Sequence, residues 1–195
     1  MIAAHPEHQP PRPPRFNGAD ADRAYDTWRC SCGPAAFAAI LGLTLDEARP
    51  HFGATFPGYT SPPLMLAALV SALGPAGPRW RVLPGSHAVA PSVSWPRYGL
   101  ARIQFGGPWM EPGVPIAARY KHTHWVGAMT TERGSGVWDV NALGNGSGWC
   151  SLDDWSRTVV PWIVEGVKRS DGTWSITHAI EVQRAPGDRR RTGGS

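Results

Sequence analysis

An apolar run of small residues near the N-terminus constrains the fold of this 195-residue chain most strongly. It reads Ala35-Ala36-Phe37-Ala38-Ala39-Ile40-Leu41, and it has no polar face, so it predicts a helix buried in the core. Gly33-Pro34 precedes the run, and proline is favoured in the first turn of a helix. Cys32 is therefore expected at the N-terminal end of this buried helix.

That position changes the chemistry of a thiol. Unpaired backbone N–H groups and the positive end of the helix dipole favour a thiolate there. Downstream, His124 begins an alternating segment, and the run Val137-Trp138-Asp139-Val140-Asn141 follows it. A thiolate nucleophile needs an imidazole for proton transfer, and the imidazole needs a carboxylate or amide to orient it. The order of Cys32, His124 and then Asp139 or Asn141 predicts nucleophilic catalysis, with both orienting candidates open because residues two apart on a strand face the same side.

Beyond the buried helix, the pattern predicts helices first and strands afterwards. Thr44-Leu45-Asp46-Glu47 has the form of a capping box and opens a short helix that ends at Pro50. Further helices are predicted at 64–73 and, short and capped, at 151–155; strands are predicted at 80–83, 100–105, 114–120, 124–130 and 136–141, and a hairpin joins 162–169 to 173–183. Helices followed by an antiparallel sheet define an α+β domain.

Composition agrees with one globular domain at 17–183, flanked by tails that are expected to be disordered. Residues 1–16 are rich in proline and residues 184–195 are basic. The tails hold six arginines against two acidic residues, which accounts for the whole net charge of +4, so no nucleic-acid partner is expected.

The cysteine count and the apolar runs bear on location. Three cysteines cannot form a complete set of disulfides, which favours a reducing compartment. The start of the chain lacks the features of a signal peptide, and no apolar run approaches the ~20 residues of a membrane span. We therefore expect a cytoplasmic protein with no membrane partner, with a virion-associated protein as the alternative.

Together these motifs resemble the papain-like cysteine peptidases, most closely the bacterial branch that includes the double-glycine leader peptidases of bacteriocin exporters. The resemblance covers residues 25–160 and rests on Cys32-Gly33-Pro34-Ala35-Ala36, the helix from Leu43 to Arg49, His124-Trp125-Val126, residues 137–141 and Ser151-Leu152-Asp153-Asp154-Trp155. It implies a fold in which N-terminal helices carrying the cysteine pack on a sheet carrying the histidine.

The resemblance also implies an activity. Cys32 is the implied nucleophile, His124 the general base and acid, and Asn141 or Asp139 the orienting residue. The implied reaction is hydrolysis of a peptide or isopeptide bond in a peptide or protein substrate, without a metal or cofactor. The same constellation also serves acyl transfer and deamidation.

One position departs from the papain-like pattern. These enzymes place a glutamine six residues before the cysteine as an oxyanion donor, and this chain has Asp26 there. The backbone N–H of Cys32 or the side chain of Trp28 would then have to bind the oxyanion. The departure motivates an alternative, in which the fold is catalytically degenerate and acts as a binding module.

The second cysteine allows one further alternative. Cys30 and Cys32, with His122 and His124, have the donor types of a zinc site, but structural zinc sites usually have two to four residues between cysteines. Cys30 is otherwise expected to be a packing or loop residue. A disulfide between Cys30 and Cys32 would be strained and easily reduced.

Overall fold

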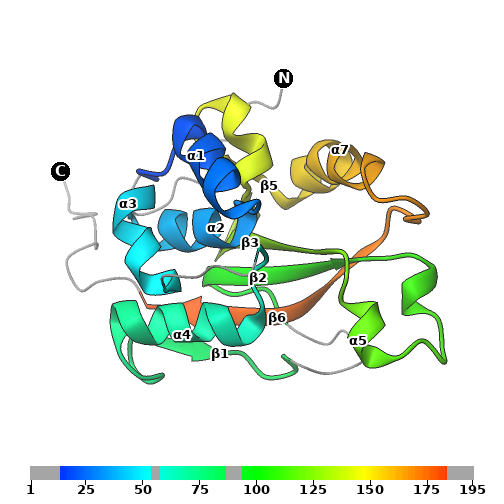
Figure 1. Ribbon diagram of the computed structural model, residues 1–195, viewed down its shortest axis with the longest axis horizontal. Helices are drawn as coiled ribbons and strands as arrows, with labels where there is room; N and C mark the ends of the chain where they lie inside the picture. The colour runs from blue at the N-terminus through cyan, green and yellow to red at the C-terminus, as the bar shows by residue number, and fades with distance from the viewer. Residues whose placement is uncertain (1–13, 54–57, 87–93, 184–195) are drawn as a thin grey trace.

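The computed structural model describes residues 14–53, 58–86 and 94–183, and the predicted tails lie almost wholly outside these residues. Figure 1 shows its elements in chain order. The α-helices are α1 (Gly18–Trp28), α2 (Cys32–Leu41), α3 (Leu45–Ala48), α4 (Pro62–Leu73), α5 (Ile116–Arg119), α6 (Leu152–Asp154) and α7 (Val160–Glu165). The strands are β1 (Trp80–Val82), β2 (Tyr98–Phe105), β3 (Thr123–Thr131), β4 (Gly134–Trp138), β5 (Trp149–Ser151) and β6 (Trp174–Val182). The 3-10 helices are Arg49–Phe52, Pro108–Met110 and Val140–Asn145, and Trp155–Val159 is a π-helical turn.

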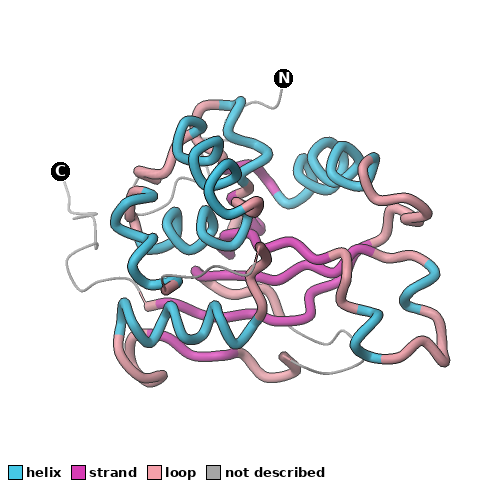
Figure 2. The backbone as a smooth tube through the Cα atoms, in the orientation of Figure 1, coloured by secondary structure: helices cyan, strands magenta, loops and turns pink. Residues whose placement is uncertain are grey.

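In the described part of the chain, the strands form one six-stranded sheet in the order β1-β6-β2-β3-β4-β5. Every neighbouring pair is antiparallel. The last strand, β6, lies between β1 and β2, so the C-terminal strand is paired on both sides. Figure 2 shows the strands running through the centre of the molecule with helices around them. The predicted α+β class with an antiparallel sheet is therefore confirmed.

The N-terminal helices α1 to α4 cover one face of the sheet. The prediction of a buried helix is confirmed, since residues 33–40 of α2 are all buried. Gly127 of β3 permits this packing, because a Cβ atom there would lie only 3.0 Å from Ile40 Cδ1 and from Trp138 Cβ. The helix therefore packs directly on β3, whose second residue is the predicted catalytic histidine, His124.

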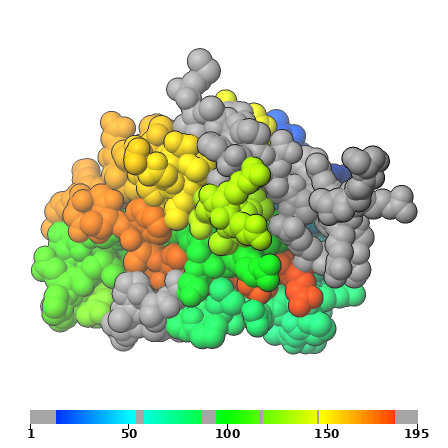
Figure 3. Space-filling view, turned by 180° about the vertical axis from the view of Figure 1, so that it is seen from behind, coloured from blue at the N-terminus to red at the C-terminus, as the bar shows by residue number. Residues whose placement is uncertain are grey.

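The helical segment from α6 to α7 covers the opposite face. Trp155, Val159 and Val160 pack with apolar residues that alternate along β2 and β3 with those facing α2. Seen from behind, α7 and the segment after it (gold to orange) lie beside the green segment that precedes β3 (Figure 3). β2 is buried along its whole length because helices cover both faces of the sheet.

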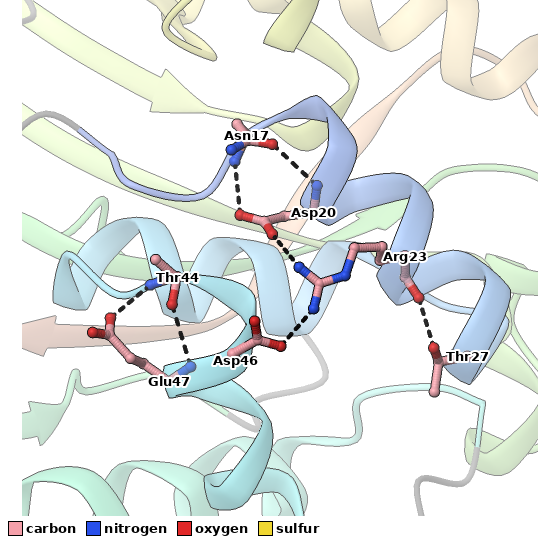
Figure 4. Close-up of polar contacts among 7 residues, drawn as sticks. All are labelled: Asn17, Asp20, Arg23, Thr27, Thr44, Asp46 and Glu47. Carbon is pink, nitrogen blue, oxygen red and sulfur yellow. Dashed lines mark hydrogen bonds and ion pairs between the residues drawn. The ribbon is translucent and has the colours of Figure 1, made fainter.

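Two capping boxes fix the N-termini of α1 and α3 (Figure 4). Asn17 accepts from the backbone N–H of Asp20 and donates its own N–H to the Asp20 carboxylate. Thr44 and Glu47 make the reciprocal pair at α3, which confirms the predicted capping box. Arg23 then links the helices through a 2.6 Å bond to Asp46 and a bond to Asp20.

Two predicted strands are wrong. The segment 114–120 forms α5 instead, following Pro115. The segment 162–169 is helical at its start because the helix that Ser151 caps continues through the π-helical turn into α7, with Pro161 in the first turn of α7. The predicted strand at 136–141 ends at Trp138, and a 3-10 helix follows.

The domain begins earlier than residue 17. Phe16 is 2% exposed and packs edge-on against Trp138, with ring centroids 6.1 Å apart. Arg15 forms a 2.8 Å ion pair with Glu47. The last residues of the predicted tail are thus part of the packed structure.

Among the helices of the described residues, none combines the length and the apolar character needed to cross a membrane.

Candidate active site

A pocket of about 310 Å³ opens where the N-terminal end of α2 meets the start of β3. Figure 1 shows the end of α1 and the segment before α4 approaching this end of α2 from opposite sides. The pocket is lined by Cys30 and Cys32 with Tyr25, Arg29 and Ser31, by Gly58, Tyr59 and Thr60, by Thr123, His124 and Trp125, and by Val140 and Asn141. The fold therefore brings the predicted nucleophile and the predicted base to one pocket.

His124 is held by a buried hydrogen bond to Asp139. The Nε2 atom of His124 lies 2.8 Å from Oδ2 of Asp139, which directly follows β4. The ring also stacks near Phe105, with centroids 6.4 Å apart. An ionised Asp139 can only accept, so Nε2 carries the proton and Nδ1 is the ring nitrogen left to act as a base.

The environment of Asp139 favours its charged form. Its carboxylate is fully buried and also accepts from Trp155 Nε1 at 2.7 Å and from the backbone N–H of Asn141 at 2.8 Å. Burial acts to raise the pKa of Asp139, but the charge and hydrogen bond of His124, with these two donors, bring that pKa below its usual value. Asp139 is thus a fixed anion behind the imidazole.

Cys32 occupies the first turn of α2 as predicted, but its thiol is not acidified. The hydrogen bond to Cys30 and the burial of the thiol raise the pKa of Cys32 well above its usual value, and the charges of Cys30 and Asp139 add to this. The backbone N–H of Trp125 acts in the other direction. The thiolate expected at Cys32 from the helix terminus is therefore opposed by the neighbouring thiol of Cys30 and by burial.

The acidified thiol is Cys30, which the sequence placed only as a packing or loop residue. The hydrogen bond from Cys32 is the main cause that lowers the pKa of Cys30 to about 6, against the effect of burial. The backbone N–H groups of Gly33 and Cys32 and the charge of His124 lower it further. The Cys30 sulfur thus occupies the free donors at the start of α2.

Thr60 forms the wall of the pocket opposite the sheet. A Cβ atom on Gly33 would collide with the Thr60 hydroxyl, so glycine is required where the loop crosses the helix. Trp125 Nε1 donates to the Thr60 carbonyl at 2.8 Å and fixes the loop to β3. The Thr60 hydroxyl is buried and has no hydrogen-bond partner among the described residues.

Arg102 places a buried positive charge beneath the site. Its side chain, 5% exposed, donates to Thr123 Oγ1 at 3.1 Å and lies over the ring of Tyr120. Burial lowers the pKa of Arg102, whereas Tyr120 and Cys32 raise it, so the Cys32 sulfur lies within reach of its charge. Arg102 is the one charged residue in the otherwise largely apolar segment 100–105, and this pattern could have identified it from the sequence.

The other residues predicted for the site do not all lie at the pocket. Asn141 lies in the 3-10 helix after β4 and bonds Asp139 through its backbone, so the imidazole bonds Asp139 and not the Asn141 side chain. Asp26 is exposed on α1 and lies outside the residues that line the pocket. Trp28 packs against Phe52 and Arg49 and is likewise not a lining residue, so it is not placed as an oxyanion donor.

The alternative zinc site is not assembled. The ring of His122 packs on Trp109, with centroids 4.2 Å apart, and His122 does not line the pocket. Within residues 14–53, 58–86 and 94–183, no group of three or more His, Cys, Asp or Glu side chains is arranged to hold a metal ion.

No protein-family model, curated protein or solved structure matches this chain.

Proposed function

We propose that this chain is a papain-like cysteine peptidase or amidase that hydrolyses a peptide or isopeptide bond through a thioester on Cys32. The observation that carries the proposal is the buried hydrogen bond between His124 and Asp139, which orients an imidazole at the wall of the pocket that also contains Cys32. An oriented imidazole beside a thiol at a helix start is the arrangement that nucleophilic acyl transfer requires. The three free thiols suit the reducing cytoplasm.

The raised pKa of Cys32 determines the order of the steps. The thiol is neutral at rest, so Nδ1 of His124 removes its proton while the sulfur attacks the substrate carbonyl. His124 then gives this proton to the leaving amine, which releases the first product and leaves the thioester. Water, deprotonated by the same nitrogen, hydrolyses the thioester and restores Cys32.

The remaining groups stabilise charge that develops in these steps. Asp139 balances the positive charge on His124 after the first proton transfer. The backbone N–H groups of Cys32 and Gly33, at the start of α2, bind the oxyanion of the tetrahedral intermediate in this proposal. In the absence of substrate, these backbone N–H groups interact with Cys30. The Cys30 side chain must therefore rotate away when substrate binds.

A second candidate is a binding module with an inert Cys32. The raised pKa of Cys32 is the observation that favours it, because a neutral, half-buried thiol reacts slowly. In that case the pocket binds a peptide without cleaving it.

The test measures the alkylation rate of Cys32 by iodoacetamide from about pH 5 to about pH 9, in a Cys30→Ser background so that one pocket thiol reacts. We expect His124→Ala to slow Cys32 alkylation at neutral pH by about 10²-fold, the usual size of a general-base contribution. His122→Ala is the matched control, because His122 lies outside the pocket, and it should leave the rate unchanged.

A second measurement follows the acyl-enzyme. Incubation of the Cys30→Ser variant with p-nitrophenyl acetate should release a burst of p-nitrophenol and leave an acetyl group on the tryptic peptide 30–79. Cys32→Ser should abolish both signals. If Cys32 alkylation does not depend on His124 and no acetyl group is found, the binding module becomes the better description.

A further inference from the structure

The pocket contains two thiols where the proposed reaction uses one. Cys30 and Cys32 are both partly exposed, both line the pocket, and are separated by one residue. The pKa of each thiol depends on the other, which places the two side chains close together. Ser31 between them has φ −121° and ψ −27°, a bent conformation that brings neighbouring side chains closer than an extended strand would.

We propose that Cys30 and Cys32 are a site of reversible oxidation, at which a hydroperoxide converts the two thiols into a disulfide. The oxidation itself does not depend on the proposed function. Only its consequence rests on that function, because the disulfide blocks the proposed nucleophile, Cys32. The sequence separation makes this disulfide strained, and strained disulfides are the ones that reductants reverse easily.

The surroundings assign different roles to the two sulfurs. The backbone N–H groups of Gly33 and Cys32 at the start of α2 lower the pKa of Cys30 and so favour its thiolate. Its pKa of about 6 makes it mostly ionised at neutral pH. Cys32 is the protonated neighbour, so Cys30 is the thiol that reacts with the peroxide first and Cys32 is the one that resolves the product.

The chemistry balances with the peroxide as the only oxidant. The Cys30 thiolate attacks one peroxide oxygen, the O–O bond breaks, and a sulfenic acid and hydroxide form. Cys32 then transfers its proton to His124, and its sulfur attacks the Cys30 sulfur and expels the second oxygen as hydroxide. Protons from solvent and from His124 convert both hydroxides to water, so two thiols lose two electrons and the peroxide gains them.

Cys150 supplies an internal control in the same protein. It is fully buried, and burial is the main cause that raises its pKa to about 12, so it should resist both peroxide and iodoacetamide while the protein is folded. Trypsin places Cys30 and Cys32 together in the peptide 30–79, because Arg49 is followed by Pro50, and separates them from Cys150.

The experiment treats the full chain with hydrogen peroxide, blocks free thiols with iodoacetamide and analyses the tryptic peptides by mass spectrometry. We expect peptide 30–79 to become two hydrogen atoms lighter and unreactive to iodoacetamide, and to recover on treatment with dithiothreitol. In Cys30→Ser, the loss of Cys32 labelling should be at least about tenfold slower, because the ionised thiol is absent. In Cys32→Ser, Cys30 should proceed to the sulfinic acid because no thiol resolves it.

The proposal is overturned if the wild-type peptide 30–79 gains oxygen atoms without losing two hydrogens, or if both cysteines remain alkylated after peroxide. It is also overturned if the disulfide joins two chains. A variant that exposes Cys150 to iodoacetamide is unfolded and is replaced by the alanine variant at the same position. These outcomes are independent of the proposed function. That function fails instead if the alkylation rate of reduced Cys32 is the same with and without His124.

Discussion

The residue that orients His124 is the most direct point at which the site can be tested. Asp139→Asn keeps a hydrogen-bonding oxygen near Nε2 but removes the charge that supports a protonated imidazole. We expect this change to slow His124-dependent alkylation of Cys32 by about 10²-fold or more. Asn141→Ala is the matched control, since Asn141 bonds Asp139 through its backbone N–H, and it should alter the rate by less than about twofold.

The reverse ranking would mean that the Asn141 side chain acts on the imidazole. Urea unfolding of both variants separates a chemical effect from a loss of structure, because an unfolded variant would show Cys150 alkylation as well.

Gly33 is a second residue with a specific requirement. A Cβ atom there would overlap the Thr60 side chain, so Gly33→Ala should lower the free energy of unfolding by about 1–3 kcal/mol, the usual effect of overpacking. Gly18→Ala is the control, because nothing lies within 4 Å of a Cβ atom at Gly18. Urea titration of both variants gives the two values. Equal effects would indicate that the loop before α4 yields easily and that the close contact does not define the pocket.

The residues of the site differ in how far sequence could predict them. Cys32 and His124 were predicted because each lies at the start of a recognisable element, and the fold then brings those starts together. Thr60 gains its place from a contact with Gly33 across the pocket, which no local pattern encodes. The interaction between the neighbouring thiols of Cys30 and Cys32 is local, but the sequence prediction considered only the helix terminus, and Cys30 raises the pKa of Cys32.

At the scale of the elements, the two helices that meet at the pocket differ in how they begin. Asn17 caps α1 through a complete capping box, whereas Ser31 makes no side-chain bond at the start of α2. We expect Asn17→Ala to lower the free energy of unfolding by about 1 kcal/mol, and Ser31→Ala to have a smaller effect. Urea unfolding gives both values. If Ser31→Ala is the more destabilising, α2 depends on a cap that forms only in solution.

The success of element prediction followed the strength of the local signals. The capping box at Thr44, the serine caps and the apolar α2 were predicted because each depends on neighbouring residues. The segment 162–169 was assigned to a strand because its β-branched and aromatic residues resemble one, but the helix begun at Ser151 extends through it. Packing against the sheet, which the sequence does not display locally, decides such segments.

At the scale of the whole molecule, the order of the strands in the sheet was not predicted from the sequence. The α+β class followed from the succession of patterns, but the insertion of β6 between β1 and β2 joins residues about 70 to about 100 positions apart. The pocket depends on this sheet, because it holds β3 and β4 in register and thereby sets His124 against Asp139.

Alkaline stability is the property of the whole molecule that a single buried group should control. The raised pKa of Cys150, about 12, means that the folded protein keeps this proton while the unfolded chain releases it near pH 9. Between these values the unfolded state binds fewer protons, so the free energy of unfolding falls by up to ~1.4 kcal/mol for each pH unit. Cys150→Ala should remove this part of the decline.

The measurement compares urea unfolding of wild type and variant at several pH values above about 9, with a reductant present. Other ionising groups cancel in the difference, which should shift in favour of the variant as pH rises. Cys150→Val is the matched control, because it fills the cavity differently and yet lacks the thiol, so its difference curve should have the same slope and another offset. A flat difference for both variants would mean that Cys150 ionises equally in the folded and unfolded protein, and that its burial in β5, beside β4, is not maintained at high pH.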